Sequence, residues 1–370
     1  MGATTKDLSS QSLALLRFPL AVVVLTQHVV MPVAVDAPGT SCVALFCNII
    51  TAFFRSQSVP IYYFISGYVF FKGVQFGYDV YKKKLRNRLF SLFIPYLVWN
   101  MVALLWYLFK SLPYFASLAP GISNIEKNYS FKALLMTFWD NSVGVLPIVN
   151  LASTQIYPVN SPLWYIRDLI IVVLATPVIY YVIKKTRFYA VALLLVLWYW
   201  SDMSDWGYAR QLLSAFAFFS FGAYMSIFRK DMIAEFGRFS RVSYILYALL
   251  GIAYVLCIYY MPQYCDSIKR VNVLVGLLFA YNISSFLISR FNCRPNTFLS
   301  SASFFIYVSH FLVYNEVFKI LKLIIPFTSD VTMIFLYIAT IVVCVVLLLS
   351  VYYLMGRFTP GVLNFMTGRK

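Results

Sequence analysis

The sequence predicts an all-α, polytopic integral membrane protein with about ten transmembrane helices and both termini in the cytoplasm. Three observations support this prediction. Of the 370 residues, 61% are hydrophobic and only 12% are charged, which leaves too much apolar surface for one soluble core. The apolar runs reach bilayer-spanning length repeatedly. Basic residues gather in the short turns on one side of these runs, as the positive-inside rule predicts.

The apolar runs divide into ten expected helices. A helix needs about 20 apolar residues to cross the hydrocarbon core, and only the fifth run is short for a span. In chain order, the expected helices occupy residues 13–34, 48–71, 89–110, 162–184, 188–201, 209–228, 242–262, 271–289, 298–322 and 331–356.

The basic residues set the orientation of these helices. Eighteen Lys and Arg residues lie in the turns and the tail on one side, and five lie in the opposite loops. Because cytoplasmic loops carry the excess of positive charge, the first side is expected to be cytoplasmic. Topology thus accounts for much of the net charge of +17, so we expect membrane lipid as a partner and no nucleic acid.

The chain is predicted to form one membrane domain over residues 1–370, with no cleavable signal peptide and no fused soluble domain. Its longest segment between expected helices is an outer loop at about 111–161, which prolines break into short elements. Within this loop, FKALLMTFWD is mildly amphipathic and suits a position at the outer membrane surface. The loop either covers a site or is a simple connection between helices.

The six cysteines form no pattern typical of a metal site, because no histidine lies near any of them in the sequence. We therefore expect no metal ion. Cys42 and Cys47 share the first outer loop, where a disulfide is one interpretation and unpaired packing is the other.

His28 and His310 are the only histidines of the chain, and both lie inside long apolar segments. An ionisable group at membrane depth is costly to insert and usually marks a pathway or a reactive site. Arg17 precedes His28 by eleven residues, which places both side chains on one helical stripe, about 16 Å apart along the axis. A neutral imidazole suits general-base catalysis, and an arginine suits binding of phosphate or carboxylate. The structural alternatives are interhelical hydrogen bonding for His28 and snorkelling for Arg17.

Two segments around the second expected helix carry further candidates. SVPIYYFISGYVFFKG places Ser66 beside Gly67, a pair that favours close helix packing or contact with a ligand. The turn that follows carries five positive charges within seven residues: Lys82, Lys83, Lys84, Arg86 and Arg88. Topology and anionic lipid explain most such clusters, and binding of phosphate groups is the functional alternative.

Two later helices carry the remaining candidates. SPLWYIRDL places Trp164, Arg167 and Asp168 in the first turns of a helix that enters from outside. Adjacent charges point in different directions on a helix, so we expect Arg167 and Asp168 each to have a partner elsewhere. SFFIYVSH places His310 near mid-membrane, where structural hydrogen bonding or support of a reactive group is the expected role.

Taken in order, six features of the sequence resemble the integral-membrane acyltransferases grouped as acyltransferase family 3. They are the Arg17 and His28 pair, VPIYYFISGY, RLFSLFIPYLVW, SPLWYIRDL, FFSFGAYMS and SFFIYVSH. The sequence departs from the family in one place. Members often carry two basic residues, three apart, before the Ile-Pro of the third helix. Arg88 fits the first position and Ser91 stands at the second, so Lys84 or Arg86 would supply the other charge.

The resemblance implies transfer of an acyl group, usually acetyl, from a cytoplasmic acyl-CoA to a hydroxyl of an outward-facing cell-surface glycan or lipid-linked sugar. His28 would accept the proton of that hydroxyl or carry the acyl group transiently, and Arg17 would steer the donor. The donor, acetyl-CoA or another acyl-CoA, would rest against Arg88 with Arg86 or Lys84. The residues that would contact or support the substrates are Ser66, Trp164, Arg167, Asp168 and His310.

The resemblance also implies a bacterial inner membrane, where the protein would act alone or hand its product to a separate machinery for glycan synthesis or export. A flippase or exporter of a sugar or lipid is the alternative function, with Arg17, His28 and Asp168 as its polar pathway. The sequence shows neither a two-fold repeat nor paired helices broken by Gly or Pro, and this favours acyl transfer.

Overall fold

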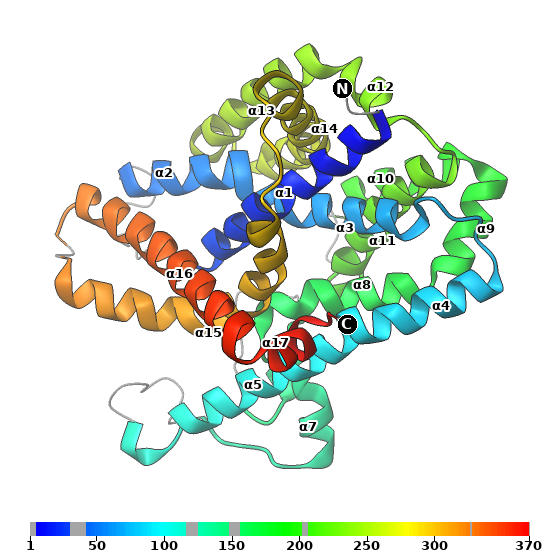
Figure 1. Cartoon of the computed structure of the whole chain (residues 1–370). Helices are drawn as coiled ribbons and strands as arrows, with labels where there is room; N and C mark the ends of the chain where they lie inside the picture. The colour runs from blue at the N-terminus through cyan, green and yellow to red at the C-terminus, as the bar shows by residue number, and fades with distance from the viewer. Residues whose placement is uncertain are drawn as a thin grey trace.

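The computed structural model describes residues 5–29, 42–115, 125–147, 156–201, 206–325 and 328–369. Within these ranges the elements are all helical, with no β-strand (Figure 1). Apolar sequences can cross a bilayer as helices because each helix satisfies its own backbone hydrogen bonds. The predicted all-α class is confirmed.

The helices have the following bounds. They are α1 Thr5–His28, α2 Cys42–Ile50, α3 Ser56–Phe71, α4 Tyr78–Arg88, α5 Ile94–Lys110, α7 Phe131–Thr137, α8 Trp164–Leu174, α9 Thr176–Thr186, α10 Phe188–Trp200, α11 Tyr208–Ile227, α12 Met232–Gly237, α13 Ser240–Tyr260, α14 Cys265–Phe291, α15 Thr297–Ile324, α16 Asp330–Phe358 and α17 Pro360–Thr367. Two π-helical turns, η1 Thr51–Arg55 and η2 Leu89–Phe93, join α2 to α3 and α4 to α5.

Seven helical stretches of the described chain are long and apolar enough to cross a membrane, and the bent pair α8–α9 makes an eighth if it counts as one span. The seven are Leu8–His28, Cys42–Phe71, Tyr78–Lys110, Ser240–Tyr260, Pro262–Phe291, Thr297–Ile324 and Asp330–Phe358. α10 is apolar but has only 13 residues. The protein is therefore a multi-pass membrane protein, while ten spans and cytoplasmic termini remain predictions.

The first helix ends earlier than its predicted range of 13–34, and residues 30–34 of that range lie outside the described residues. α1 starts at Thr5 and stops at His28. The carbonyl oxygen of Thr26 would accept a backbone N–H if the helix continued. Instead it accepts hydrogen bonds from the guanidinium of Arg55 and from the hydroxyl of Tyr337. Side chains from other helices thus terminate α1 and leave His28 at its end.

The fourth predicted helix, 162–184, is divided in the structure into α8 and α9, which are bent by 63°. Pro177 causes this break, because it has no N–H to donate to the carbonyl oxygen of Val173. The hydroxyl of Thr176 donates to that oxygen instead, at 2.7 Å. The bend leaves α8 packed against α11 and η2, with Arg167 and Asp168 buried in the bundle.

The closest helix pair is α3 and α11, and two glycines make the close approach possible. A Cβ on Gly67 would lie 2.0 Å from the carbonyl oxygen of Phe219, and one on Gly222 would lie 2.0 Å from that of Phe64. Close helix packing therefore explains the glycine at position 67. Small residues allow such close approach of helices in many membrane bundles.

Gly67→Ala is expected to destabilise the protein by about 1–3 kcal/mol, because α3 and α11 must move apart to admit the methyl group. Thermal unfolding of the purified protein in detergent measures this loss. Gly237→Ala is the matched control, since a Cβ at Gly237 meets no atom within 4 Å. Equal melting temperatures for the two variants would contradict the close helix contact.

Near the centre of the molecule, α1 crosses α15, and α16 runs beside α15 (Figure 1). Buried side chains of α1, α3, α8, α11 and α15 form the largest hydrophobic cluster. At the C-terminal end, α17 turns back from α16 and packs against α5. The crossing of α1 and α15 brings the candidate site together.

Candidate functional site

The two histidines of the chain meet where α1 ends against α15. Their ring centroids lie 5.2 Å apart, although the residues are 282 positions apart in the sequence. Phe311 packs edge-on against the ring of His28 at 5.3 Å, and the ring of Tyr314 lies 6.3 Å away. Helical spacing along the sequence identifies no partner for His310 on the same face of its own helix. In the structure its neighbour is His28, from another helix.

His310 is fully buried, whereas His28 is half-buried. The Nδ1 atom of His310 lies 3.1 Å from the carbonyl oxygen of Ile306, and Nε2 has no hydrogen-bond partner in the described part of the chain. When Nδ1 donates to that carbonyl, Nε2 is a proton acceptor. A buried acceptor of this kind can exchange a proton with a neighbouring group.

Arg55, a residue missed by the sequence predictions, holds the end of α1 in place. One of its nitrogens, Nη2, donates to the carbonyl oxygen of Thr26 and to the hydroxyl of Tyr337, the latter at 2.9 Å. In the other direction, Nε2 of Gln27 donates to the carbonyl oxygen of Arg55 at 2.8 Å. These bonds join the last turn of α1 to η1, so the position of His28 depends on this π-helical turn.

The charge of Arg55 also faces the site. Within the described residues, Arg55 makes no ion pair with a carboxylate, and its guanidinium is close enough to His28 for an electrostatic interaction. π-helical turns recur at functional sites of helical proteins. The sequence did contain a signal for Arg55, since it is an arginine inside the apolar run 48–71. A charged side chain is costly at membrane depth and often marks a functional site.

Three tyrosines connect the histidine pair with Arg17. The ring of Tyr307 lies 6.3 Å from that of His310 and 5.8 Å from that of Tyr165. The ring of Tyr62 lies 5.8 Å from that of Tyr165, and its hydroxyl donates to the backbone carbonyl of Arg17 at 2.8 Å. An aromatic path thus links the two halves of the predicted Arg17–His28 motif.

The end of this path carries a group of positive charges, here called the basic mouth: Arg17, Lys84 and Arg88. Arg17 is exposed, and Arg88 lies within electrostatic reach of both Arg17 and Tyr165. Lys84 donates to the carbonyl oxygen of Phe70, and its Nζ lies 5.1 Å from the centre of that ring. Lys84 lies within electrostatic reach of Arg88 as well, and three neighbouring cations suit the phosphate groups of a donor.

Ser66 lies next to this path. The hydroxyl of Ser66 lies 3.2 Å from the hydroxyl of Tyr165. The ring centroids of Tyr165 and Tyr63 are 4.7 Å apart. The predicted Ser66 therefore adjoins the candidate site, whereas its neighbour Gly67 serves helix packing.

Arg86 faces a different space from Lys84. A cavity of about 470 Å³ lies between α4–η2 and α8, with Lys82, Arg86 and Arg88 at its polar side. The other lining residues are apolar: Leu85, Leu89, Leu92, Phe93, Ile170, Val173 and Leu174. Of the three predicted donor-binding residues, Arg88 lines this cavity and also belongs to the basic mouth. Lys84 belongs only to the basic mouth, and Arg86 lines only the cavity.

Arg167 and Asp168 each have a partner elsewhere, as expected, but they also pair with one another, which the sequence did not predict. They bond to one another, with Arg167 Nε donating to Asp168 Oδ1 at 2.9 Å. The long arginine side chain folds back because its Nη1 also donates to the carbonyl of Trp139, at 2.7 Å, and the guanidinium lies over the ring of Tyr208. Tyr208 donates to Asp168 Oδ1 at 3.1 Å. The pair is a buried link between α8, α11 and the outer loop.

The described parts of the outer loop cover the bundle beside the histidines. The first seven residues of FKALLMTFWD form α7, as the amphipathic pattern suggests. Loop residues pack against α5 and against Phe311, the residue in contact with His28. Asn160 donates to the carbonyl oxygen of Val308 at 3.0 Å. Trp164 begins α8 and is half-buried against the main cluster. Of the two interpretations, the described part of the loop fits a cover.

Cys42 and Cys47 are not bonded to one another. Of the two interpretations of this pair, the structure agrees with unpaired packing, because Cys47 packs at the margin of the hydrophobic cluster that contains Leu25 and Tyr337.

Comparison with known proteins identifies the family. A family model described as an acyltransferase domain matches residues 10–352, which include Arg17, His28, Arg88 and His310. No curated protein and no solved structure matches the chain. The match covers nearly the whole chain and agrees with the ordered motifs of the sequence. The chain therefore belongs to acyltransferase family 3, the integral-membrane acyltransferases.

Proposed function

We propose that this membrane acyltransferase moves an acyl group, most simply acetyl, from cytoplasmic acyl-CoA to a hydroxyl of a cell-surface glycan or lipid-linked sugar. The single observation that carries the proposal is the contact between His28 and His310 at the end of α1. Two imidazoles inside a bundle provide proton-accepting groups where water is scarce.

His28 accepts the proton of the acceptor hydroxyl as its oxygen attacks the thioester carbonyl carbon. The new bond is the C–O bond of the ester, and the bond that breaks is the C–S bond of the thioester. The thiolate that leaves takes up one proton, so His28 returns to its neutral form. The ring of His310 packs against that of His28, and Arg55 positions His28 through the end of α1.

The basic mouth receives the donor. Phosphate groups are recognised by guanidinium and ammonium groups, and Arg17, Lys84 and Arg88 supply both kinds. The aromatic path of Tyr62, Tyr165 and Tyr307 leads from there to His310. A flexible thioester arm fits such a path better than a rigid, highly polar ligand does.

The acceptor reaches His28 from the opposite side, past the outer loop. Phe311 and Leu312 pack against this loop, next to the histidine contact. The Arg167–Asp168 pair holds the loop through the carbonyl oxygen of Trp139. These residues shape the acceptor side and take no part in proton transfer.

Purified protein incubated with radiolabelled acetyl-CoA and candidate glycans tests the proposal. Label incorporated into the glycan as an ester supports acyl transfer, whereas a flippase or exporter forms no ester. In cells, the glycan mass with and without the protein gives the mass of the added acyl group, and fragmentation locates the sugar. Unchanged glycans in both tests would contradict the proposal.

Variants of Arg17 test its role at the basic mouth. Arg17→Ala and Arg17→Lys are both expected to raise the KM for acyl-CoA, by about tenfold for a lost charge-assisted bidentate contact. Lysine retains the charge but not the forked geometry. Steady-state kinetics at varied acyl-CoA measure the change. Full activity of Arg17→Lys would indicate simple snorkelling to the headgroups.

A further inference from the structure

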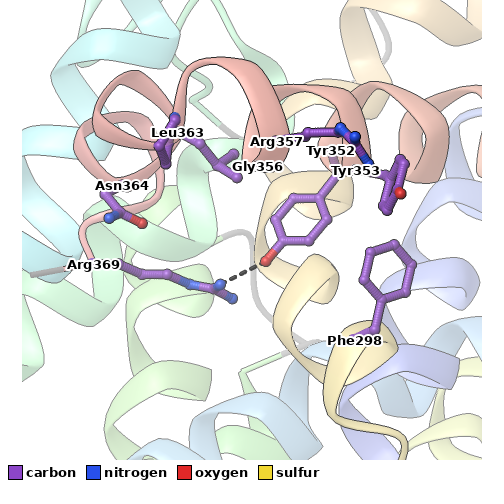
Figure 2. Close-up of a pocket in the computed structure, with 9 residues that line it drawn as sticks. Phe298, Tyr352, Tyr353, Gly356, Arg357, Leu363, Asn364 and Arg369 are labelled. Carbon is purple, nitrogen blue, oxygen red and sulfur yellow. Dashed lines mark hydrogen bonds between the residues drawn. The ribbon is translucent and has the colours of Figure 1, made fainter.

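A second cavity, of about 420 Å³, lies where α15 begins, α16 ends and α17 follows (Figure 2). It is separate from the histidine pair and from the basic mouth. Its lining combines aromatic rings with two guanidinium groups and an amide, from Phe298, Tyr352, Tyr353, Arg357, Asn364 and Arg369.

Arg369 is held in a fixed position in this cavity. Its Nη1 donates to the hydroxyl of Tyr352 at 2.5 Å, as Figure 2 shows, and its Nη2 donates to the carbonyl oxygen of Ser301. The guanidinium carbon lies 5.6 Å from the centre of the Tyr352 ring. All of these partners are neutral, so the side chain is ordered while its charge is not balanced.

Arg357 adds a second unbalanced charge. Among the residues that the structure describes, neither Arg357 nor Arg369 makes an ion pair with a carboxylate. The side chain of Arg357 is exposed, belongs to the lining of the cavity and has no hydrogen bond in that part of the chain. A cavity lined by two guanidinium groups and an amide suits an oxyanion, and arginine binds phosphate well in two-pronged geometry.

The surroundings of the cavity indicate where the phosphate comes from. Arg357 lies in the last turn of the most apolar span, α16. Beside it, Phe358, Val362 and Phe365 expose 71%, 52% and 58% of their surface. α17 buries Leu363 against the protein and presents Val362 and Phe365 outward, as a helix does at a membrane surface, and Phe358 at the end of α16 is exposed beside them. A ligand that suits both the arginines of the cavity and the apolar membrane surface beside it has a phosphate group and acyl chains. A phospholipid has both.

We propose that this cavity binds the phosphate group of an anionic phospholipid and thereby fixes α17 on the bundle. The proposal does not depend on the acyl-transfer reaction. α17 in turn touches the turn that follows the basic mouth. Trp99 donates to the carbonyl oxygen of Met366 at 2.9 Å, and a Cβ on Gly368 would lie 2.5 Å from the carbonyl oxygen of Phe90 in η2. A bound lipid therefore stabilises the packing of α17 against η2 and α5.

Lipid titration of the purified, delipidated full-length protein tests this proposal. Binding of dioleoyl phosphatidylglycerol is measured by native mass spectrometry, with dioleoyl phosphatidylcholine, CoA and inorganic phosphate as separate arms. Arg357→Gln is the main variant, because Arg357 holds no other group in place and its loss leaves the fold intact. Arg290→Gln is the matched control, since Arg290 is an exposed arginine at the end of α14 and does not line the cavity.

Arg357→Gln is expected to lower the affinity for phosphatidylglycerol about tenfold, while Arg290→Gln leaves it unchanged. The lipid is also expected to raise the melting temperature of the wild type more than that of Arg357→Gln. Equal affinities for wild type and Arg357→Gln would overturn the proposal. Loss of CoA or inorganic phosphate binding in Arg357→Gln, with no binding of phosphatidylglycerol to the wild type, would overturn the lipid assignment and give the phosphate site to a soluble ligand.

Discussion

Replacing His28 with alanine is expected to abolish acyl transfer, with turnover about 10²–10⁴-fold lower, the usual range for loss of a general base. In the proposed mechanism the imidazole accepts the hydroxyl proton, and alanine leaves no acceptor at the end of α1. The rate of label transfer from acetyl-CoA to glycan, at saturating concentrations of both substrates, measures the effect.

His310→Phe is the comparison for this experiment. Phenylalanine keeps a ring against His28 and removes the two nitrogens, so a smaller loss of turnover is expected. Both variants should insert in the membrane and melt near the wild-type temperature, because the rings lie 5.2 Å apart without a hydrogen bond between them. Nearly normal turnover in His28→Ala would exclude His28 as the proton acceptor.

Replacing Arg55 with alanine is expected to lower turnover about 100-fold with little change in the KM for acyl-CoA, since small misplacements of a reacting group cost about that much. The variant removes the guanidinium bond to the carbonyl oxygen of Thr26, so the last turn of α1 keeps only the bond of Gln27 to η1 and the bond from Tyr337. Steady-state kinetics with separate kcat and KM values measure the effect.

Two controls distinguish positioning from a general loss of stability. Arg55→Lys keeps a positive donor and is expected to recover part of the turnover. Tyr337→Phe removes one partner of Arg55 but leaves the bond to Thr26, so a small effect is expected. A raised KM with normal turnover in Arg55→Ala would show that Arg55 binds the donor and does not position His28.

The sequence was sufficient for the fold class and for the family, because both depend on long patterns. Apolar runs and basic turns define a multi-pass membrane protein, and the ordered motifs define the acyltransferase family. It was insufficient for the ends of the helices. α1 stops at His28 because Arg55 and Tyr337, from distant segments, take up the carbonyl of its last turn.

Pairwise contacts between helices were the hardest to predict. A helical wheel relates Arg17 to His28, since both lie on α1, but it says nothing about His310, which belongs to α15. The wheel also gave no indication that Arg167 and Asp168 bond to one another. It places their Cβ atoms about 100° apart, but the arginine side chain is long enough to fold back to its neighbour.

The role of Arg55 was also beyond prediction from the sequence. Its position in an apolar run was visible, but its role depends on η1, which turns its guanidinium toward the end of α1. A regular helix over 48–71 would not predict this geometry, since a π-helical turn shifts every side chain that follows it.

The meeting of the only two histidines in the chain has a spectroscopic consequence. Protein grown with histidine that is ¹⁵N-labelled in the ring carries label only at these two neighbouring imidazoles. Every imidazole signal then reports on this one place, without background from the other 368 residues. Tautomer, protonation and any transient acyl adduct can be followed in the intact protein as substrate is added, and the native chain needs no substitution for the measurement.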